Sequence, residues 1–213
     1  MKVRKVVNRS GRGFRGYFPS RKLGRLVEWE SLLERDAIIL FEFSNGIKSY
    51  QEQPELIVYE QDGEMRRYFP DFSITLSNDE VVHLEVKPAS KLTSLDLLNK
   101  FDAIARHYDR IGRNFRILTD DYIRDEPRLT NLKRFASVQH HKGDLQVVQL
   151  KVINLLKDGS IFTVQSLSKI YGFTNVLVLL ARGTICCNMN VELLSVINFL
   201  RLPGGDDYEA LYV

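Results

Sequence analysis

The chain has 213 residues, 44% apolar and 27% charged, the make-up of a globular protein large enough for one good core and a small second domain. No stretch approaches the roughly 18 consecutive apolar residues of a membrane span, and the Lys- and Arg-rich start lacks the apolar part of a secretion signal, so we expect a cytoplasmic bacterial protein. The net charge is +3, but residues 1–27 hold nine Lys and Arg and no acid (+9), which leaves −6 for the remainder.

Residues 1–25 are predicted to form a basic arm that contacts DNA. Aromatic residues lie between its cations, a composition that combines phosphate contacts with packing on sugars or bases. The alternative is a solubilising tail without a ligand. The candidate DNA-binding residues are Arg4, Lys5, Arg9, Arg12, Arg15, Arg21, Lys22 and Arg25.

Residues 26–43 are predicted to form a helix, because they lack Pro and Gly and their apolar residues recur at steps of three or four. Apolar character extends around much of this helix, which indicates that it is covered on more than one side. An acid within it then requires a cleft or a metal, and Glu34 is the acid we select. The alternatives are a surface Glu34 paired with an arginine, or Glu30 as the functional acid one turn earlier.

Three antiparallel strands are predicted next. Residues 47–60 are expected to be extended and to reach a hairpin turn at Asp62-Gly63, and residues 69–76 and 81–87 flank a second turn. Residues 93–110 return to helical spacing, and residues 115–119 supply one more strand by a crossover connection. We therefore predict an α/β fold class for residues 26–138, with the core order helix, three antiparallel strands, helix, strand.

A second domain is predicted in residues 144–213, after a polar connector. Helical spacing in residues 145–156, 164–171 and 176–182, an extended segment at 184–188 and a last helix at 191–200 predict a small winged-helix-like module. It contains five basic and six acidic residues, a charge of −1. Because this balance is unusual for a major-groove reader, protein docking is favoured over DNA contact.

The chemistry-bearing pattern is Pro70-Asp71 followed by Glu85-Val86-Lys87. If the second hairpin turns at Asn78, paired residue numbers sum to 156, so Asp71 lies opposite Glu85 with the two Cβ atoms about 5 Å apart. Two carboxylates this close repel one another unless a hard cation such as Mg²⁺, with Mn²⁺ as a substitute, chelates them. Lys87 points to the same face and can orient or deprotonate an attacking water.

Other polar residues on these strands are possible members of the site. His83 shares the predicted face with Asp71 and Glu85, where it is either a supporting residue or a plain surface histidine. Gln53 and Glu52 can reach the same site from the first strand, but strand-edge polar residues are the commoner explanation. The predicted catalytic set is thus Glu34, Asp71, Glu85 and Lys87, with the three acids as metal ligands.

These motifs resemble the TnsA-type endonuclease subunit of heteromeric cut-and-paste transposases, a family of PD-(D/E)xK type. The resemblance is carried by residues 30–36 around Glu34, Glu52-Gln-Pro54, Pro70-Asp-Phe72, residues 84–89 and residues 117–120. It implies a restriction-endonuclease-like domain that cuts the 5′ ends of the element in double-stranded DNA. In other members Gln replaces the acid at the Glu85 position. The implied partners are the DDE-type transposase TnsB and the AAA+ regulator TnsC, the latter through the C-terminal domain.

Two other interpretations share parts of this evidence. A free-standing restriction or repair nuclease would use the same chemistry without the partners. A non-catalytic DNA-binding scaffold would keep the fold with incidental acids, and Asp71→Ala would then change no biochemical phenotype.

Overall fold

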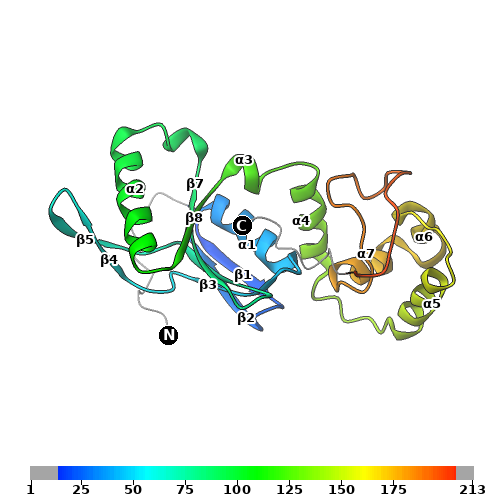
Figure 1. Cartoon of the computed structure of the whole chain (residues 1–213). Helices are drawn as coiled ribbons and strands as arrows, with labels where there is room; N and C mark the ends of the chain where they lie inside the picture. The colour runs from blue at the N-terminus through cyan, green and yellow to red at the C-terminus, as the bar shows by residue number, and fades with distance from the viewer. Residues whose placement is uncertain (1–13, 205–213) are drawn as a thin grey trace. The chain divides into compact units, whose positions relative to one another are not determined.

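The computed structural model describes residues 14–204 and divides into two compact units, the first ending at Ile123 and the second beginning at Arg124 (Figure 1). This division precedes the predicted boundary near residue 138, because α4 (Arg128–Val138) packs against α7 (Phe173–Ala181) of the second unit. None of the helices described between residues 14 and 204 combines the length and apolar character that a membrane span needs.

The first unit is built around a four-stranded mixed sheet in the order β3-β6-β7-β8. β3 and β6 pair antiparallel, as do β6 and β7, whereas β8 pairs parallel to β7 after a crossover through α2. The predicted α/β class and the order helix, three strands, helix, strand are confirmed for this sheet. The extended segment predicted at 47–60 is instead divided into Ile47–Glu52 of this sheet and Ile57–Gln61 of a separate two-stranded sheet. The elements are β3 (Ile47–Glu52), β6 (Phe72–Leu76), β7 (Val81–Lys87), η1 (Ala89–Lys91), α2 (Leu95–Arg110), β8 (Asn114–Thr119) and α3 (Asp120–Ile123).

The register of the β6–β7 hairpin is the predicted one. Phe72 pairs with Leu84, Ser73 with His83, and Ile74 with Val82, so each pair sums to 156. Alternation along the strands sends Phe72 and Leu84 to one face and His83 and Glu85 to the other. The register matters for the site, because a slip of one residue along either strand would move Glu85 and His83 to the opposite face of the sheet.

The predicted helix at 26–43 is wrong in its first six residues. Residues 25–29 are β2 (Arg25–Trp29), which pairs antiparallel with β1 (Gly16–Ser20), and α1 (Leu32–Phe43) begins only after Ser31. The Ser31 side chain accepts a hydrogen bond from the backbone N–H of Glu34 and so caps the helix. The described part of the predicted basic arm therefore belongs largely to a folded hairpin.

A second hairpin, β4 (Ile57–Gln61) and β5 (Glu64–Tyr68), forms a separate two-stranded sheet between β3 and β6 in the chain. The predicted turn at Asp62-Gly63 is confirmed, with φ angles of 54° and 78°. Positive φ at both positions matches the twist of a tight hairpin. This hairpin brings Tyr68 over the sheet face that carries Glu85.

Both faces of the central sheet are covered. α1 packs on the Phe72 face, with the rings of Phe41 and Phe72 5.4 Å apart, and α2 covers the other face, with Tyr108 stacked on Phe115 at 5.1 Å. The His83 face was expected to be the polar face of the hairpin, yet residues 82–86 are all buried. Polar groups on this face therefore need internal partners.

The second unit contains α4, α5 (Gln146–Lys157), α6 (Val164–Tyr171) and α7. The predicted last helix at 191–200 is wrong, since these residues form turns between two isolated bridges, Thr163 to Phe199 and Cys186 to Arg201. Asn198 is fully buried within this loop, and its amide donates to the carbonyls of Asn188 and Val191 at 3.0 and 3.2 Å. A side chain, rather than helical backbone bonds, thus holds the loop.

Candidate active site

The hairpin brings Asp71, Glu85 and Lys87 together at one end of the sheet. Asp71 directly precedes β6, while Glu85 and Lys87 lie two residues apart near the end of β7. The Lys87 ammonium lies 2.8 Å from Oε1 of Glu85 and 3.8 Å from Oδ2 of Asp71. The amine therefore bridges two acids contributed by neighbouring strands.

Asp71 is held by the backbone of the facing strand. Its Oδ2 accepts a hydrogen bond of 2.8 Å from the N–H of Val86, and its side chain remains 22% exposed. Burial, followed by the negative charge of Glu85, raises the pKa of Asp71 from its usual 3.8 to about 7. The Lys87 charge and the Val86 hydrogen bond act in the opposite direction but do not offset these two effects.

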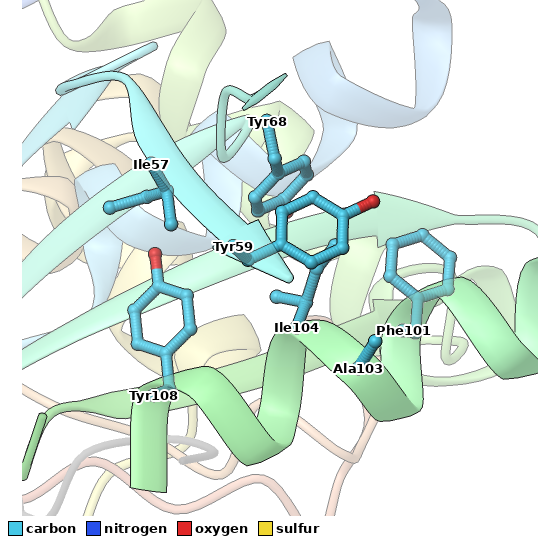
Figure 2. Close-up of a cluster of buried hydrophobic side chains, with 7 residues drawn as sticks. All are labelled: Ile57, Tyr59, Tyr68, Phe101, Ala103, Ile104 and Tyr108. Carbon is cyan, nitrogen blue, oxygen red and sulfur yellow. The ribbon is translucent and has the colours of Figure 1, made fainter. Parts of the chain in front are cut away.

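Glu85 is almost completely buried, with 3% exposure, and its carboxylate is fixed at both oxygens. Oε2 accepts a 2.5 Å hydrogen bond from the hydroxyl of Tyr68, and Oε1 faces Lys87. Tyr68 belongs to the buried cluster formed by β4, β5 and α2 (Figure 2). Its ring lies 5.3 Å from the Lys100 ammonium. This aromatic wall separates Glu85 from solvent and sets its orientation.

Lys87 stays protonated in this setting. Burial alone would lower its pKa, but the negative charges of Asp71, Glu85 and Glu34 together raise the pKa above its ordinary value. The side chain is 32% exposed, so the ammonium faces both the acids and solvent. As arranged, Lys87 is a cation paired with two acids rather than a free base.

Glu34 lies near this group but is engaged in capping α1. Its Oε2 accepts from the N–H of Glu30 at 2.8 Å and its Oε1 from the Ser31 hydroxyl at 2.9 Å, which adds to the Ser31 cap on the same turn. Burial raises the pKa of Glu34, and its charge contributes, after burial and Glu85, to the raised pKa of Asp71. Glu30, the competing candidate, is exposed and supplies its backbone N–H to this arrangement.

The acids at this site are chemically suitable ligands for a hard divalent cation, but their present spacing does not form a closed binding site. Between residues 14 and 204, no three His, Cys, Asp or Glu side chains converge closely enough to hold a metal ion. Asp71 and Glu85 nevertheless form a buried acid pair whose repulsion helps to raise an aspartate pKa to about 7, and carboxylate oxygens are the donors Mg²⁺ prefers. Glu34 would join such a site by leaving its capping bonds.

His83 is not the surface histidine that the sequence allowed. It is 2% exposed, shares a 2.6 Å hydrogen bond with the Tyr108 hydroxyl, and lies 3.5 Å from Glu55. Burial, aided by the charge of Arg113, lowers the pKa of His83 to about 4, so the ring is neutral at pH 7.

Glu52 is also committed, because both its oxygens accept from the guanidinium of Arg25 at 2.9 and 2.7 Å. This ion pair fixes β2 beside β3. Gln53, the next residue, directly follows β3 and donates its backbone N–H to the carbonyl of Asp71 at 2.9 Å.

The predicted DNA-binding residues separate into three groups. Arg4, Lys5, Arg9 and Arg12 lie outside the described residues. Arg15 and Arg21 lie at the surface of the β1–β2 hairpin, whereas Arg25 pairs with Glu52. Lys22 donates to three backbone carbonyls, those of Phe41, Ser44 and Ile47, at 2.6 to 2.7 Å. Lys22 therefore anchors the hairpin to the end of α1.

Tyr68 is the residue that inspection of the sequence missed. It contacts Glu85 directly although seventeen positions separate the two residues. The available signal was a tyrosine two residues before the Pro70-Asp71 motif, in a strand expected after the Asp62-Gly63 turn. Nothing in the local pattern indicated that this strand would leave the central sheet and fold over its buried face.

One family model matches part of the chain. Residues 44–120 match the model described as TnsA-like endonuclease N terminal. The match contains Asp71, Glu85 and Lys87 but begins after Glu34. No curated protein matches the chain.

Proposed function

We propose that this chain, whose residues 44–120 are a TnsA-like endonuclease N-terminal domain, is a metal-dependent DNA endonuclease with a restriction-endonuclease-like core. The observation that carries the proposal is the pairing of partly buried Asp71 and buried Glu85 with Lys87, whose ammonium lies 2.8 Å from Glu85. A solvated sheet face would leave both acids hydrated and would not raise the pKa of Asp71 to about 7. The reaction is hydrolysis of a phosphodiester bond.

Mg²⁺, or Mn²⁺ in its place, would be held by Asp71 and Glu85, with Glu34 as the third acid. When bound, such an ion polarises the phosphorus and neutralises charge on the leaving oxygen. The two fixed carboxylates supply its negative ligands. The raised pKa of Asp71 supports this assignment. The charge of Glu85 contributes to the raised pKa, and the charge of Lys87 does not cancel the increase. A divalent cation beside the two acids would relieve their repulsion.

Lys87 would hold the attacking water and balance the charge that develops on the phosphate. Its ammonium is a hydrogen-bond donor on a side chain that is 32% exposed, which suits contact with a scissile phosphate. Tyr68 keeps the Glu85 carboxylate in one orientation while the aromatic cluster excludes water from its rear. The hydrogen bond between Tyr68 and Glu85 is a preorganised contact that needs no rearrangement during the reaction.

The biological substrate we propose is a transposon end in double-stranded DNA, cut on the non-transferred strand at its 5′ end. A DDE-type transposase of TnsB type would cut and join the 3′ ends. The family match to the endonuclease domain supports this. Arg15 and Arg21, with Arg4, Lys5, Arg9 and Arg12 of the basic arm, would contact the DNA backbone.

The second unit is proposed to be a winged-helix-like module that docks an AAA+ regulator of TnsC type. Its α5, α6 and α7 are followed by a loop between two antiparallel bridges, an arrangement compatible with such a module. The charge of −1 over residues 144–213 favours a protein partner. The compact unit itself begins earlier, at Arg124, and its residues 128–143 add four basic residues and no acid, so the charge argument applies to residues 144–213 alone.

A nicking assay on plasmid DNA with transposon ends, with and without the transposase and regulator subunits, tests the proposal. We expect Mg²⁺- or Mn²⁺-dependent cutting by the wild type, loss of cutting in Asp71→Ala and Lys87→Ala, and no loss in Asp109→Ala, which removes an exposed acid of α2. Equal cutting by Asp71→Ala and the wild type would reject the nuclease assignment. Metal-dependent cutting that is indifferent to partners and ends would instead favour a free-standing nuclease.

A further inference from the structure

Gln53 has an unusual backbone conformation directly beside the acid pair. It follows β3 with a φ of 41°, one of three positive φ values among the non-glycine residues from 14 to 204. The other two, Asp62 and Asp79, are hairpin-turn aspartates, a residue type that tolerates this region. A glutamine has no such preference, and strain of this kind concentrates at functional sites where the surroundings enforce it.

The Gln53 backbone is held opposite Asp71. Its N–H donates to the Asp71 carbonyl at 2.9 Å, which continues the register that pairs Glu52 with Phe72. The Gln53 backbone therefore lies directly across from Asp71, the acid that precedes β6.

The side-chain oxygen of Gln53 is buried and has no hydrogen-bond partner in the described part of the chain. The contrast with the preceding residue is informative, because Glu52 satisfies both its oxygens with Arg25. Buried polar atoms are almost always paired, so an orphan oxygen next to a catalytic acid indicates a missing partner. That partner must be a hydrogen-bond donor or a cation, since an amide oxygen is an acceptor.

We propose that the amide oxygen of Gln53 is a neutral ligand of the divalent cation at Asp71 and Glu85, an inference that rests on the proposed nuclease function. Mg²⁺ and Mn²⁺ accept amide oxygens beside carboxylates, and a neutral donor adds coordination without adding to the charge already crowded at the site. Cation binding also supplies the partner that the buried oxygen lacks.

The test measures Mn²⁺ binding by calorimetry on the full chain, independently of DNA cutting. Gln53→Leu should weaken Mn²⁺ affinity by about tenfold or more, the range found when groups supporting a metal site are removed, and Gln53→Glu should restore most of it. Gln51→Leu, two residues earlier on β3, is the matched control and should bind as the wild type does. In the nicking assay, the Mg²⁺ concentration for half-maximal cutting should rise in parallel for Gln53→Leu.

Gln53→Gly guards against misfolding, because glycine adopts a φ of 41° without strain and also lacks the amide. Wild-type Mn²⁺ affinity in both Gln53→Gly and Gln53→Leu, with lost affinity in Asp71→Ala, would overturn the Gln53 assignment and leave the nuclease proposal standing. Undiminished Mn²⁺ affinity in Asp71→Ala, or no Mn²⁺ binding by the wild type, would remove the metal-dependent nuclease itself.

Discussion

Replacing Asp71 by asparagine should stabilise the metal-free protein at neutral and alkaline pH. The amide oxygen of the new side chain would still accept from the Val86 N–H, and the charge that repels Glu85 would be gone. Burial and the Glu85 charge raise the Asp71 pKa from 3.8 to about 7, and one pKa unit is equivalent to about 1.4 kcal/mol. The charged aspartate therefore costs the folded state about 4 kcal/mol when the pH exceeds 7.

The sign follows from proton binding. Between pH 3.8 and about 7 the folded state holds a proton on Asp71 that the unfolded state has lost, so stability falls as the pH rises through this window. The asparagine variant lacks this contribution. Its advantage over the wild type should be near zero at about pH 4, grow steadily to about pH 7 and stay constant above it.

Urea unfolding in EDTA at about pH 5, 6, 7 and 8 measures this difference, and a second series in Mg²⁺ provides the functional contrast. Mg²⁺ at about one hundred times its dissociation constant should raise the free energy of unfolding of the wild type by about 2.7 kcal/mol and that of the asparagine variant far less. Parallel stability curves for the two proteins across this pH range would refute the reasoning, because they would mean that Asp71 is not under electrostatic strain.

The other expectations concern residues outside the acid pair. Tyr68→Phe should lower the free energy of unfolding by about 1–3 kcal/mol, because it leaves a buried carboxylate oxygen unpartnered; an unchanged urea midpoint would contradict this. Lys22→Met, which removes a donor to three carbonyls, should cost about 3 kcal/mol, whereas Arg21→Met should leave stability intact and weaken DNA binding in a filter assay. The reverse pattern would make Lys22 the DNA contact. Asn198→Ala should make the loop that contains Asn198 more susceptible to limited proteolysis, because the side chain no longer holds it. Equal cleavage rates for this variant and the wild type would contradict that role.

The hairpin carrying Asp71 and Glu85 was predictable because two local signals agree. Strand alternation assigns the faces, and the turn residues at 77–79 fix which positions oppose each other. Together they place Asp71 near Glu85 without knowledge of the remaining fold. The proximity of Lys87 follows from the same period of two.

The errors occur where long-range contacts outweigh local pattern. Residues 26–29 have helical spacing, yet the antiparallel partner Gly16–Ser20 and the Ser31 cap decide for a strand followed by a later helix start. Residues 191–200 are also apolar at helical steps, but a buried asparagine amide binds their carbonyls. The burial of the His83 face was equally hidden, since β5 and α2 reach it from distant parts of the chain.

Under the proposed function, Lys87 has two roles: it stabilises the metal-free site and it takes part in the reaction. Without a cation its ammonium bridges both acids, and its raised pKa, which burial alone would lower, reflects the attraction of Asp71, Glu85 and Glu34. A divalent ion held by Asp71 and Glu85 would supply that attraction instead and would leave the amine free for water and phosphate. The positive charge that stabilises the metal-free site would then be available for the reaction when the metal is bound. A lysine paired with two acids would in this way suit a metal-dependent hydrolase.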